Sequence, residues 1–354
     1  MIKQNLKVPK TMKGAVLWET GKPLSIENKI LIPELNHGQV LIKIAFSGVC
    51  RSQLMEVRGY RGIDNYLPHL LGHEGCGQVV SIGKNVKKVG VGDWVILGWI
   101  KGRGINSKGA IYRIDNHKIN SGPVTTFSTY SVVSENRVVK LPKSLPKDIA
   151  VLFGCALPTG AGMVLNQIKP KRNSVIAIFG LGGIGLSSLI ACNHFNLSKV
   201  IAIDISNEKL EIAKDFGATH TINPKIQSTR KVIQEITNGN GVDYTIESAG
   251  YTKTIESAFD LVKINGGKCF FASHPKKGDK IKIDPFDLIS GKNIYGSWGG
   301  GCKPDKDIPL LATMYNKGKL PLDKLITKKY TLDEINLALN DLENFNVFRP
   351  IIVF

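Results

Sequence analysis

A chain of 354 residues is too long for one ordinary hydrophobic core and suits two domains. Hydrophobic residues make up 42% and charged residues 21%, as in a soluble globular protein, and no run approaches the roughly 20 apolar residues of a membrane helix. The N-terminus lacks the apolar stretch of a signal peptide, so we expect a cytoplasmic protein without a membrane partner. The six cysteines are not closely paired, which predicts reduced thiols.

The net charge of +18 raises the question of nucleic-acid binding. The basic residues are scattered between apolar segments, and no aromatic-interleaved stripe accompanies them. We therefore expect solvated lysines and no nucleic-acid partner. Attraction of an anionic cofactor or substrate stays open.

In chain order, residues 13–47 predict short strands broken by glycine and proline, and residues 78–97 predict further strands. Residues 98–122 are glycine-rich and polar, which predicts a lobe or long loop. Thr126–Lys140 again predicts a strand. Residues 1–156 are therefore expected to be rich in β-structure.

Four residues of this region carry metal-binding chemistry: Cys50, His73, Glu74 and Cys155. Thiolate and imidazole are ligands that zinc prefers, and a catalytic zinc takes three protein ligands with one position left open. Taken alone, Cys50 would be assigned as a buried structural thiol. The other cysteines in apolar contexts, Cys76, Cys192 and Cys269, are expected to be small core residues.

The segment from Ser174 to Asp204 predicts a strand, a glycine turn, a helix and a second strand that ends in a carboxylate. Its turn carries Gly180, Gly182, Gly183, Ile184 and Gly185. In such a unit the first glycine permits the tight turn, the second lets a pyrophosphate approach, and the last lets helix and strand pack closely. Asp204 lies 19 residues past Gly185, where an acid accepts hydrogen bonds from the adenosine ribose. The pattern predicts dinucleotide binding; the alternative, glycines that only pack, leaves Asp204 unexplained.

Six motifs, in this order, resemble the zinc-dependent alcohol dehydrogenases of the medium-chain dehydrogenase/reductase family over nearly the whole chain. They are Gly48-Val-Cys-Arg-Ser52, Gly72-His-Glu-Gly75, Gly90-Val-Gly-Asp93, Gly154-Cys-Ala-Leu-Pro-Thr-Gly160, Gly180-Leu-Gly-Gly-Ile-Gly185 and Gly217-Ala-Thr219.

The resemblance implies that Cys50, His73 and Cys155 bind a catalytic zinc and that Glu74 is the carboxylate that can replace water on it. Ser52 would take the proton of the alcohol. A zinc ion lowers the pKa of bound water from about 16 to about 7 and acts similarly on an alcohol. Hydride then passes to the nicotinamide, while the protein supplies position and charge.

The same resemblance implies that Arg51 and Arg349 contact the pyrophosphate and that Thr159 packs beside the nicotinamide. Asp204 and Lys209 would hold the adenosine ribose. Because Asp204 would face the 2′-phosphate of NADP and no arginine follows it directly, NAD is the expected cofactor.

For the substrate, the resemblance implies a channel lined by Trp99 and Phe127. Arg58 and Arg61 follow Ser52 in a loop and could recruit an anionic substrate. Solvated loop arginines are the expected alternative.

Three departures from the family pattern stand out. Residues 98–122 contain no cysteine where many relatives bind a structural zinc, so we expect one zinc per chain. Gln53 replaces the aspartate that usually orients the zinc-bound histidine. Met55 replaces the histidine that ends the proton relay in some relatives, so the exit of the proton stays open.

We therefore predict an α/β protein: a GroES-like β-rich catalytic domain at 1–156 and 298–354, with an inserted Rossmann domain, a doubly wound parallel sheet, at 157–297. The predicted function is reversible NAD-dependent oxidation of a small alcohol to an aldehyde or ketone, in a homo-oligomer. The alternatives are a polyol or sugar-derivative dehydrogenase and a non-catalytic nucleotide-binding sensor. The intact positions Cys50, Ser52, His73 and Cys155 argue against the sensor.

Overall fold

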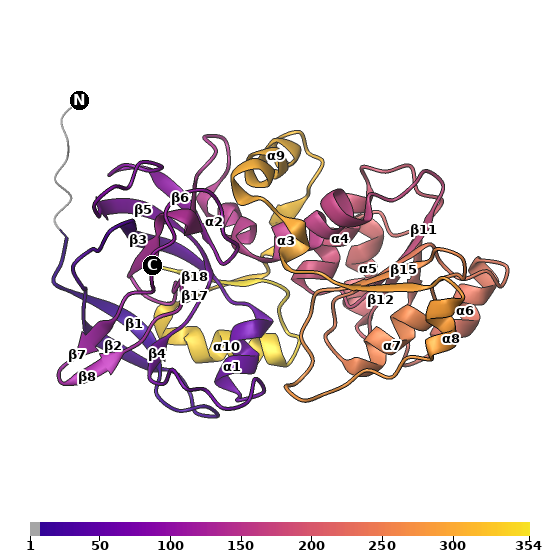
Figure 1. Cartoon of the computed structure of the whole chain (residues 1–354), viewed down its shortest axis with the longest axis horizontal. Helices are drawn as coiled ribbons and strands as arrows, with labels where there is room; N and C mark the ends of the chain where they lie inside the picture. The colour runs from indigo at the N-terminus through magenta and orange to yellow at the C-terminus, as the bar shows by residue number, and fades with distance from the viewer. Residues whose placement is uncertain (1–7) are drawn as a thin grey trace. The chain divides into compact units, whose positions relative to one another are not determined.

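The computed structural model describes residues 8–354 and divides into two compact units (Figure 1). Unit 1 runs up to Cys155 and takes in Lys303–Asn316 and Leu322–Phe354. Unit 2 comprises Ala156–Cys302 and Lys317–Pro321. One β-rich unit and one unit with a parallel sheet confirm the predicted fold class. The predicted domain limits stay a prediction, since compactness does not establish independent folding.

Unit 1 holds two sheets. The five-stranded sheet has the order β4-β1-β2-β7-β8, and its strands lie side by side in Figure 1. In the seven-stranded sheet the order is β10-β6-β5-β3-β18-β17, and β9 also pairs with β3. The strands are β1 (Thr11–Leu17), β2 (Ser25–Leu31), β3 (Gln39–Gly48), β4 (His69–Leu70), β5 (Glu74–Ile82), β6 (Trp94–Gly98), β7 (Tyr112–Ile114), β8 (His117–Ile119), β9 (Tyr130–Ser134), β10 (Val138–Lys140), β17 (Lys328–Thr331) and β18 (Pro350–Val353).

Apart from α9, the helices of unit 1 are short, and several lie at strand ends. They are α1 (Arg51–Val57), η1 (Glu135–Arg137), α2 (Lys147–Ala150), η2 (Val151–Gly154), α9 (Pro304–Asn316), η5 (Leu322–Leu325), η6 (Leu332–Glu334) and α10 (Ile335–Glu343).

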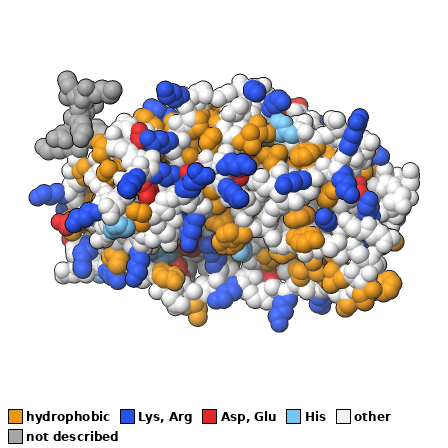
Figure 2. Space-filling view, turned by 45° about the horizontal axis from the view of Figure 1, so that its top comes forward, with side chains coloured by type: hydrophobic (Ala, Val, Ile, Leu, Met, Phe, Trp, Pro, Cys, Tyr) orange, Lys and Arg blue, Asp and Glu red, His pale blue; other side chains and the backbone are white. Residues whose placement is uncertain are grey.

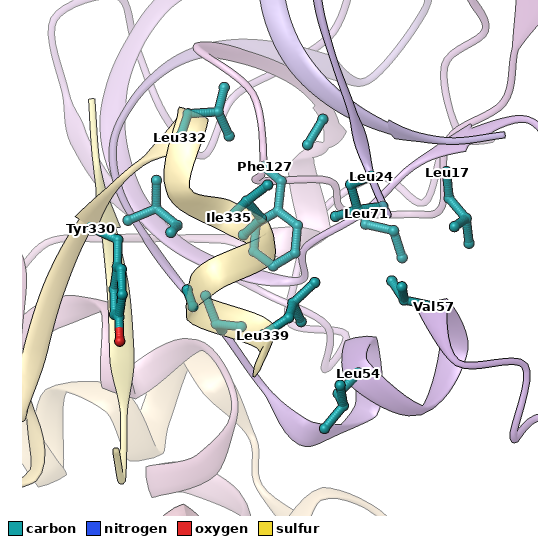
Figure 3. Packing of buried hydrophobic residues seen from close by; sticks show 14 residues of the cluster. Leu17, Leu24, Leu54, Val57, Leu71, Phe127, Tyr330, Leu332, Ile335 and Leu339 are labelled. Carbon is teal, nitrogen blue, oxygen red and sulfur yellow. The ribbon is translucent and has the colours of Figure 1, made fainter. Parts of the chain in front are cut away.

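A hydrophobic core joins the start and the end of the chain within unit 1 (Figure 3). Ile335, Ala338 and Leu339 lie on one face of α10, because residues three and four apart share a helix face. They pack in one cluster with Leu54 of α1 and with the fully buried ring of Phe127. The core therefore fixes α1, the helix that follows Cys50.

Unit 2 holds a six-stranded parallel sheet with the order β13-β12-β11-β14-β15-β16, which is the doubly wound order 3-2-1-4-5-6. Its strands are β11 (Val175–Phe179), β12 (Lys199–Ile203), β13 (His220–Ile222), β14 (Tyr244–Glu247), β15 (Lys268–Phe271) and β16 (Asn293–Gly296). The remaining elements are α3 (Ala156–Gly162), η3 (Met163–Ile168), α4 (Gly183–Cys192), α5 (Asn207–Asp215), α6 (Thr229–Ile236), α7 (Thr252–Asp260), α8 (Pro285–Ile289) and η4 (Gly299–Gly301).

The central strands of this sheet are continuous apolar runs, as strands covered on both faces are. Four of the five residues of β11 and four of the five of β12 are buried. Cys192 and Cys269 are buried in unit 2 and Cys76 in unit 1, where burial raises the pKa of each thiol to about 12.

Residues 99–111 form no strand, and side chains of η1 and the residue before it hold them in place. The Glu135 carboxylate accepts hydrogen bonds from the backbone N–H groups of Lys87 (2.6 Å), Lys88 (2.7 Å) and Ile105 (2.8 Å). Ser134 Oγ accepts from the N–H of residue 107 at 2.7 Å, and Arg137 donates to the carbonyl of Trp99. A buried carboxylate thus joins this segment to the loop before β6.

No single helix within residues 8–354 is long and apolar enough to cross a membrane; Lys147–Gly154 and Ala156–Ile168 reach that length only together, across a break, and most of their residues are buried. Figure 2 shows Lys and Arg side chains dispersed over the visible face, with hydrophobic side chains between them.

We expect Glu135→Gln to lower the free energy of unfolding by about 1–3 kcal/mol at pH 7, because an amide nitrogen would face backbone N–H donors. Burial alone would raise the pKa of Glu135, but hydrogen bonds from Ile105, Lys88 and Lys87 lower it below its usual 4.5. The carboxylate's contribution is therefore complete above the usual pKa and is lost as the pH falls through the lower, folded value. Urea unfolding of both proteins from pH 7 to pH 3 should show the difference shrinking with acidity. An equal difference at every pH would contradict this.

Candidate active site

Cys50 lies between β3 and α1 and is the N-cap residue of that helix. Its backbone N–H donates to Gln53 Oε1 at 3.1 Å, and Gln53 Nε2 faces Nδ1 of His73. One amide side chain therefore contacts the turn that carries Cys50 and the ring of His73.

His73 and Glu74 lie at the start of β5, and Cys155 directly follows η2. One ligand atom from each of Cys50, His73, Glu74 and Cys155 lies within 4.8 Å of the others, and His73 Nε2 is 3.1 Å from Cys155 Sγ. The structure thus brings together in unit 1 the four residues that the sequence singled out.

Glu74 is completely buried, and glycines make room for it. A Cβ on Gly48 would come within 2.7 Å of the Glu74 carboxyl carbon, and a Cβ on Gly154 within 2.7 Å of the Glu74 Cβ. Arg349, 4% exposed, donates from Nη2 to Glu74 Oε1. The ion pair between Glu74 and Arg349 therefore lies where four parts of unit 1 meet: the end of β3, the start of β5, the end of η2 and the residue before β18.

The buried charges alter one another's pKa values. The hydrogen bond from Cys155 lowers the pKa of the Cys50 thiol well below its usual value, and it raises the pKa of Cys155 correspondingly. Burial opposes protonation of His73, yet the hydrogen bond to Cys50 and its charge raise the pKa of the imidazole. Burial raises the pKa of Glu74 while Arg349 opposes that shift. The protons of the four side chains are thus bound by the cluster as a whole.

The residues present fit a zinc ion. Two thiols and one imidazole are ligands of zinc catalytic centres, and two thiolates would balance a divalent charge. Glu74 Oε2 is buried without a hydrogen-bond partner, so a carboxylate oxygen remains available beside the ligand cluster. A cation at this point would be bound by the lone pairs of side chains that hydrogen-bond to one another in this structure.

Ser52 lies in the first turn of α1, and its Oγ is buried without a hydrogen-bond partner. Such an atom is costly unless a ligand pairs with it. Met55 is half-buried one turn further along α1. The structure thus leaves a hydroxyl beside Cys50 available to a substrate.

The two residues expected to line the substrate channel lie in different surroundings. Trp99 is half-buried at the start of the segment that Glu135 holds, and its carbonyl accepts from Arg137. Phe127 has no exposed surface and packs in the core of unit 1 (Figure 3), which is the place of a core residue rather than of a channel wall.

The glycine turn of unit 2 follows β11 and begins α4, as the sequence predicted. Gly180 has φ +83°, a left-handed conformation that favours glycine. A Cβ on Gly185 would come within 2.7 Å of Ser248 Oγ, so helix and strand approach closely there. Nothing lies within 4 Å of the Cβ position of Gly182, the N-cap of α4, which leaves backbone open to an anion.

Asp204 directly follows β12 and is 9% exposed. Its Oδ2 accepts from the N–H of Leu181 at 2.6 Å, and its Oδ1 accepts from the N–H of Ser206 at 2.9 Å. The carboxylate therefore ties the glycine turn to the end of the neighbouring strand. Lys209, in the first turn of α5, and Thr159, in α3, are both buried.

The arginines after Cys50 all have partners within unit 1. Arg51 lies over the ring of Phe345, 5.8 Å from its centroid. Arg58 donates to Glu343 Oε2 at 2.7 Å, and Arg61 lies 3.6 Å from a carboxylate oxygen of Glu56. Arg58 and Arg61 therefore each have an acidic partner, and Arg51 has an aromatic one.

Sequence reasoning missed the pairing of Arg349 with Glu74 and the clamp at Glu135. Glu74 was recognised through its neighbour His73, but nothing local in the sequence indicates a partner 275 residues away. Glu135 follows a strand of ordinary composition, so no motif marks it.

Two family models match this chain, the alcohol dehydrogenase GroES-like domain at residues 36–143 and the zinc-binding dehydrogenase at residues 183–317. The chain is also 32% identical to benzyl alcohol dehydrogenase from Acinetobacter calcoaceticus, with a TM-score of 0.87 over 97% of this chain and 99% of that one. The chain belongs to the zinc-dependent alcohol dehydrogenases of the medium-chain dehydrogenase/reductase family. It is a zinc-type oxidoreductase that acts on alcohols, which are small molecules, and this confirms the predicted family and class of reaction.

Other solved structures agree with this family assignment. An alcohol dehydrogenase zinc-binding domain protein from Burkholderia ambifaria is 30% identical over 97% of this chain and 98% of that one, with a TM-score of 0.88. The 2R,3R-butanediol dehydrogenase of Bacillus subtilis is 26% identical over 97% of this chain and all of that one, with a TM-score of 0.77.

We expect Gln53→Ala to weaken zinc binding about 10- to 100-fold, the usual effect of removing a side chain that orients a ligand histidine. A histidine that binds metal through Nε2 donates from Nδ1. When the Gln53 amide is turned over, its oxygen takes the place of Nε2 beside Nδ1 and accepts that hydrogen bond. Gln53→Glu keeps an acceptor of the same length and should retain the affinity. Competition with a chromophoric chelator measures both, and thermal unfolding controls for the cap of α1. Unchanged zinc affinity in Gln53→Ala would show that Gln53 does not orient His73.

Proposed function

We propose that this alcohol dehydrogenase is NAD-dependent and holds one catalytic zinc at Cys50, His73 and Cys155, with Glu74 beside the ion. It would oxidise an alcohol reversibly to an aldehyde or ketone. The observation that carries the proposal is the convergence of two thiols and one imidazole next to a buried, partnerless hydroxyl, Ser52.

In this proposal zinc supplies Lewis acidity at the alcohol oxygen, and NAD accepts the hydride. Ser52 Oγ, which is buried without a partner, would accept a hydrogen bond from the alcohol hydroxyl and take its proton while passing its own proton on toward solvent. Gln53 orients the His73 ring, and Arg349 keeps the Glu74 carboxylate charged beside the ligands. The chain's own residues thus bind, orient and move one proton.

Several features of unit 2 support NAD as the cofactor. The N–H groups of the first turn of α4 have no partner within the helix, and such a helix N-terminus attracts a pyrophosphate. Asp204 lies at the end of β12, where its carboxylate would accept from ribose hydroxyls and repel a 2′-phosphate. Lys209 beside the ribose and Thr159 beside the nicotinamide, with Arg51 and Arg349 of unit 1 at the pyrophosphate, complete the proposed contacts.

For the substrate we put aryl alcohols first, because a relative 32% identical is a benzyl alcohol dehydrogenase. A diol is the second choice, because a 26% identical relative is a butanediol dehydrogenase. A screen of aryl alcohols, diols and sugar derivatives by NADH absorbance separates these classes. Turnover of any of them excludes a non-catalytic nucleotide sensor.

A homo-oligomer and a cytoplasmic location stay predictions. Supporting the oligomer, β16 pairs only with β15 among the described strands and ends its sheet. Exposed apolar side chains lie close to it in sequence, Phe286 and Ile289 of α8 and Tyr295 of β16 itself. An edge strand with apolar neighbours is suited to contact a second chain.

We expect elemental analysis to find close to one equivalent of zinc that survives dialysis, because residues 98–122 offer no cysteine for a second closed site. Cys155→Ala should lose both this zinc and alcohol turnover, while quenching of protein fluorescence by NADH persists. Cys76→Ala is the matched control, since it removes a buried thiol outside the ligand cluster. Two dialysis-resistant equivalents, or undiminished turnover in Cys155→Ala, would contradict the proposal.

We expect NAD to be preferred over NADP and Asp204→Ala to relax that preference, because the substitution removes both the ribose acceptor and the repulsion of a 2′-phosphate. The ratio of kcat/KM for the two cofactors measures it. Asp215→Ala, in the same unit at the end of α5, controls for general loss of negative charge. Equal or better use of NADP by the unmodified enzyme would overturn the assignment.

A further inference from the structure

A second group of metal-binding side chains lies in unit 1, outside the four-residue cluster. It consists of Glu56 from α1, Asp64 from the following loop and His69 from β4. His69 Nε2 lies 2.8 Å from Asp64 Oδ2 and 3.8 Å from Glu56 Oε1. His69 is 5% exposed, and the side chains of Asp64 and Glu56 are 11% and 27% exposed.

The hydrogen-bond partners of His69 leave its two nitrogens unequal. Nδ1 lies 3.0 Å from the carbonyl oxygen of Leu70, which can only accept, so Nδ1 carries the proton. In the neutral ring Nε2 then has a lone pair, and that lone pair faces the carboxylate oxygen of Asp64. Two acceptors 2.8 Å apart require a cation between them, either a proton or a metal ion.

The surroundings hold these acceptors in place. Asp64 Oδ1 accepts from the N–H of Tyr66 at 2.9 Å, which leaves Oδ2 directed at the ring. His69 is paired with Leu17 in the sheet, and its neighbour Leu70 donates to the carbonyl of Asn120 at 2.9 Å. An imidazole fixed through Nδ1 by a backbone carbonyl is the usual support of a metal-binding histidine.

Charge favours a divalent ion over a proton. Asp64 and Glu56 bring two negative charges. Among residues 8–354, the Lys or Arg side chain paired with them is Arg61, which lies 3.6 Å from Glu56 with 43% of its side chain exposed. Exposure screens that ion pair, so it offsets little of the charge. Two carboxylates and one imidazole form a ligand set that suits zinc and its first-row neighbours.

We propose that Glu56, Asp64 and His69 bind a divalent first-row transition-metal ion at a second site, separate from the thiol-containing cluster. Without a thiolate this site exchanges its ion, so the ion is lost on dialysis while the zinc at Cys50 stays. The bound ion joins α1, the next loop and β4, and α1 begins directly after Cys50. Occupancy therefore stabilises the segment that carries the catalytic residues.

The test uses the full-length enzyme after dialysis, with its resident zinc in place and Zn²⁺ as the titrant. Calorimetry should find one further equivalent. His69→Gln and Asp64→Asn should each weaken that equivalent at least about tenfold, as loss of a ligand does. His117→Gln is the matched control, because His117 is an exposed histidine of β8 outside the cluster. Zn²⁺ should also raise the Tm of the parent and the control but not of the two ligand variants.

Cobalt distinguishes this site from the thiol cluster. Co²⁺ taken up by the dialysed enzyme at the second site should add no thiolate-to-metal charge-transfer band, because all three ligands are nitrogen or oxygen. Alcohol turnover of His69→Gln in the absence of added metal shows that the variant is folded. If the parent enzyme binds no further Zn²⁺, a proton bridges His69 and Asp64 and the proposal is overturned. If an extra equivalent binds but neither substitution weakens it, the second ion lies elsewhere, which overturns the proposal as well.

Discussion

A carboxylate without exposed surface requires a positive partner, and in this enzyme that requirement organises the ligand cluster. Glu74 is completely buried, and Arg349 is the cation that pairs with it. Breaking such a pair leaves an uncompensated charge in the interior, which costs several kcal/mol. The glycines at positions 48 and 154 leave the space that Glu74 needs, so the segments that bring Cys50 and Cys155 pack against the same side chain. With two thiolates, a divalent ion, one carboxylate and one guanidinium, the buried charges sum to zero.

Buried polar groups also need partners in the segment after β6, where a carboxylate rather than a metal ion supplies them. Backbone N–H groups in an irregular segment must be satisfied when they are buried. Glu135, which is 3% exposed, accepts from one of them, that of Ile105, and also from those of Lys87 and Lys88 in the loop before β6. The Glu135 carboxylate therefore holds irregular backbone segments together, as a bound ion does in a structural zinc site. The polar residues of η1 can be understood only together with the loops they hold.

The sequence predicted those parts of the structure that are specified locally. The turn at Gly180, the strand before it and the position of Asp204 follow from hydrophobic runs and glycine spacing. β11, α4 and β12 follow one another within the segment Ser174–Asp204, in the predicted order. Contacts between distant segments could not be predicted. Arg349 carries no signal of its partner Glu74, and Phe127 was placed by resemblance at a channel, whereas its contacts belong to the core with Ile335. The role of Gln53 was easier to predict, because it lies only three residues after Cys50. Its contact with His73, however, depends on how the residue before β5 lies against the first turn of α1.

The central claim is that Cys50, His73 and Cys155 form one metal centre, and the environment of the metal tests it most directly. X-ray absorption at the zinc edge of the dialysed enzyme should show two sulfur neighbours at about 2.3 Å and nitrogen or oxygen neighbours at about 2.0–2.2 Å. Cys155→Ser, if it retains any zinc, should show one sulfur. A first shell made only of nitrogen and oxygen, or four sulfurs, would contradict the account.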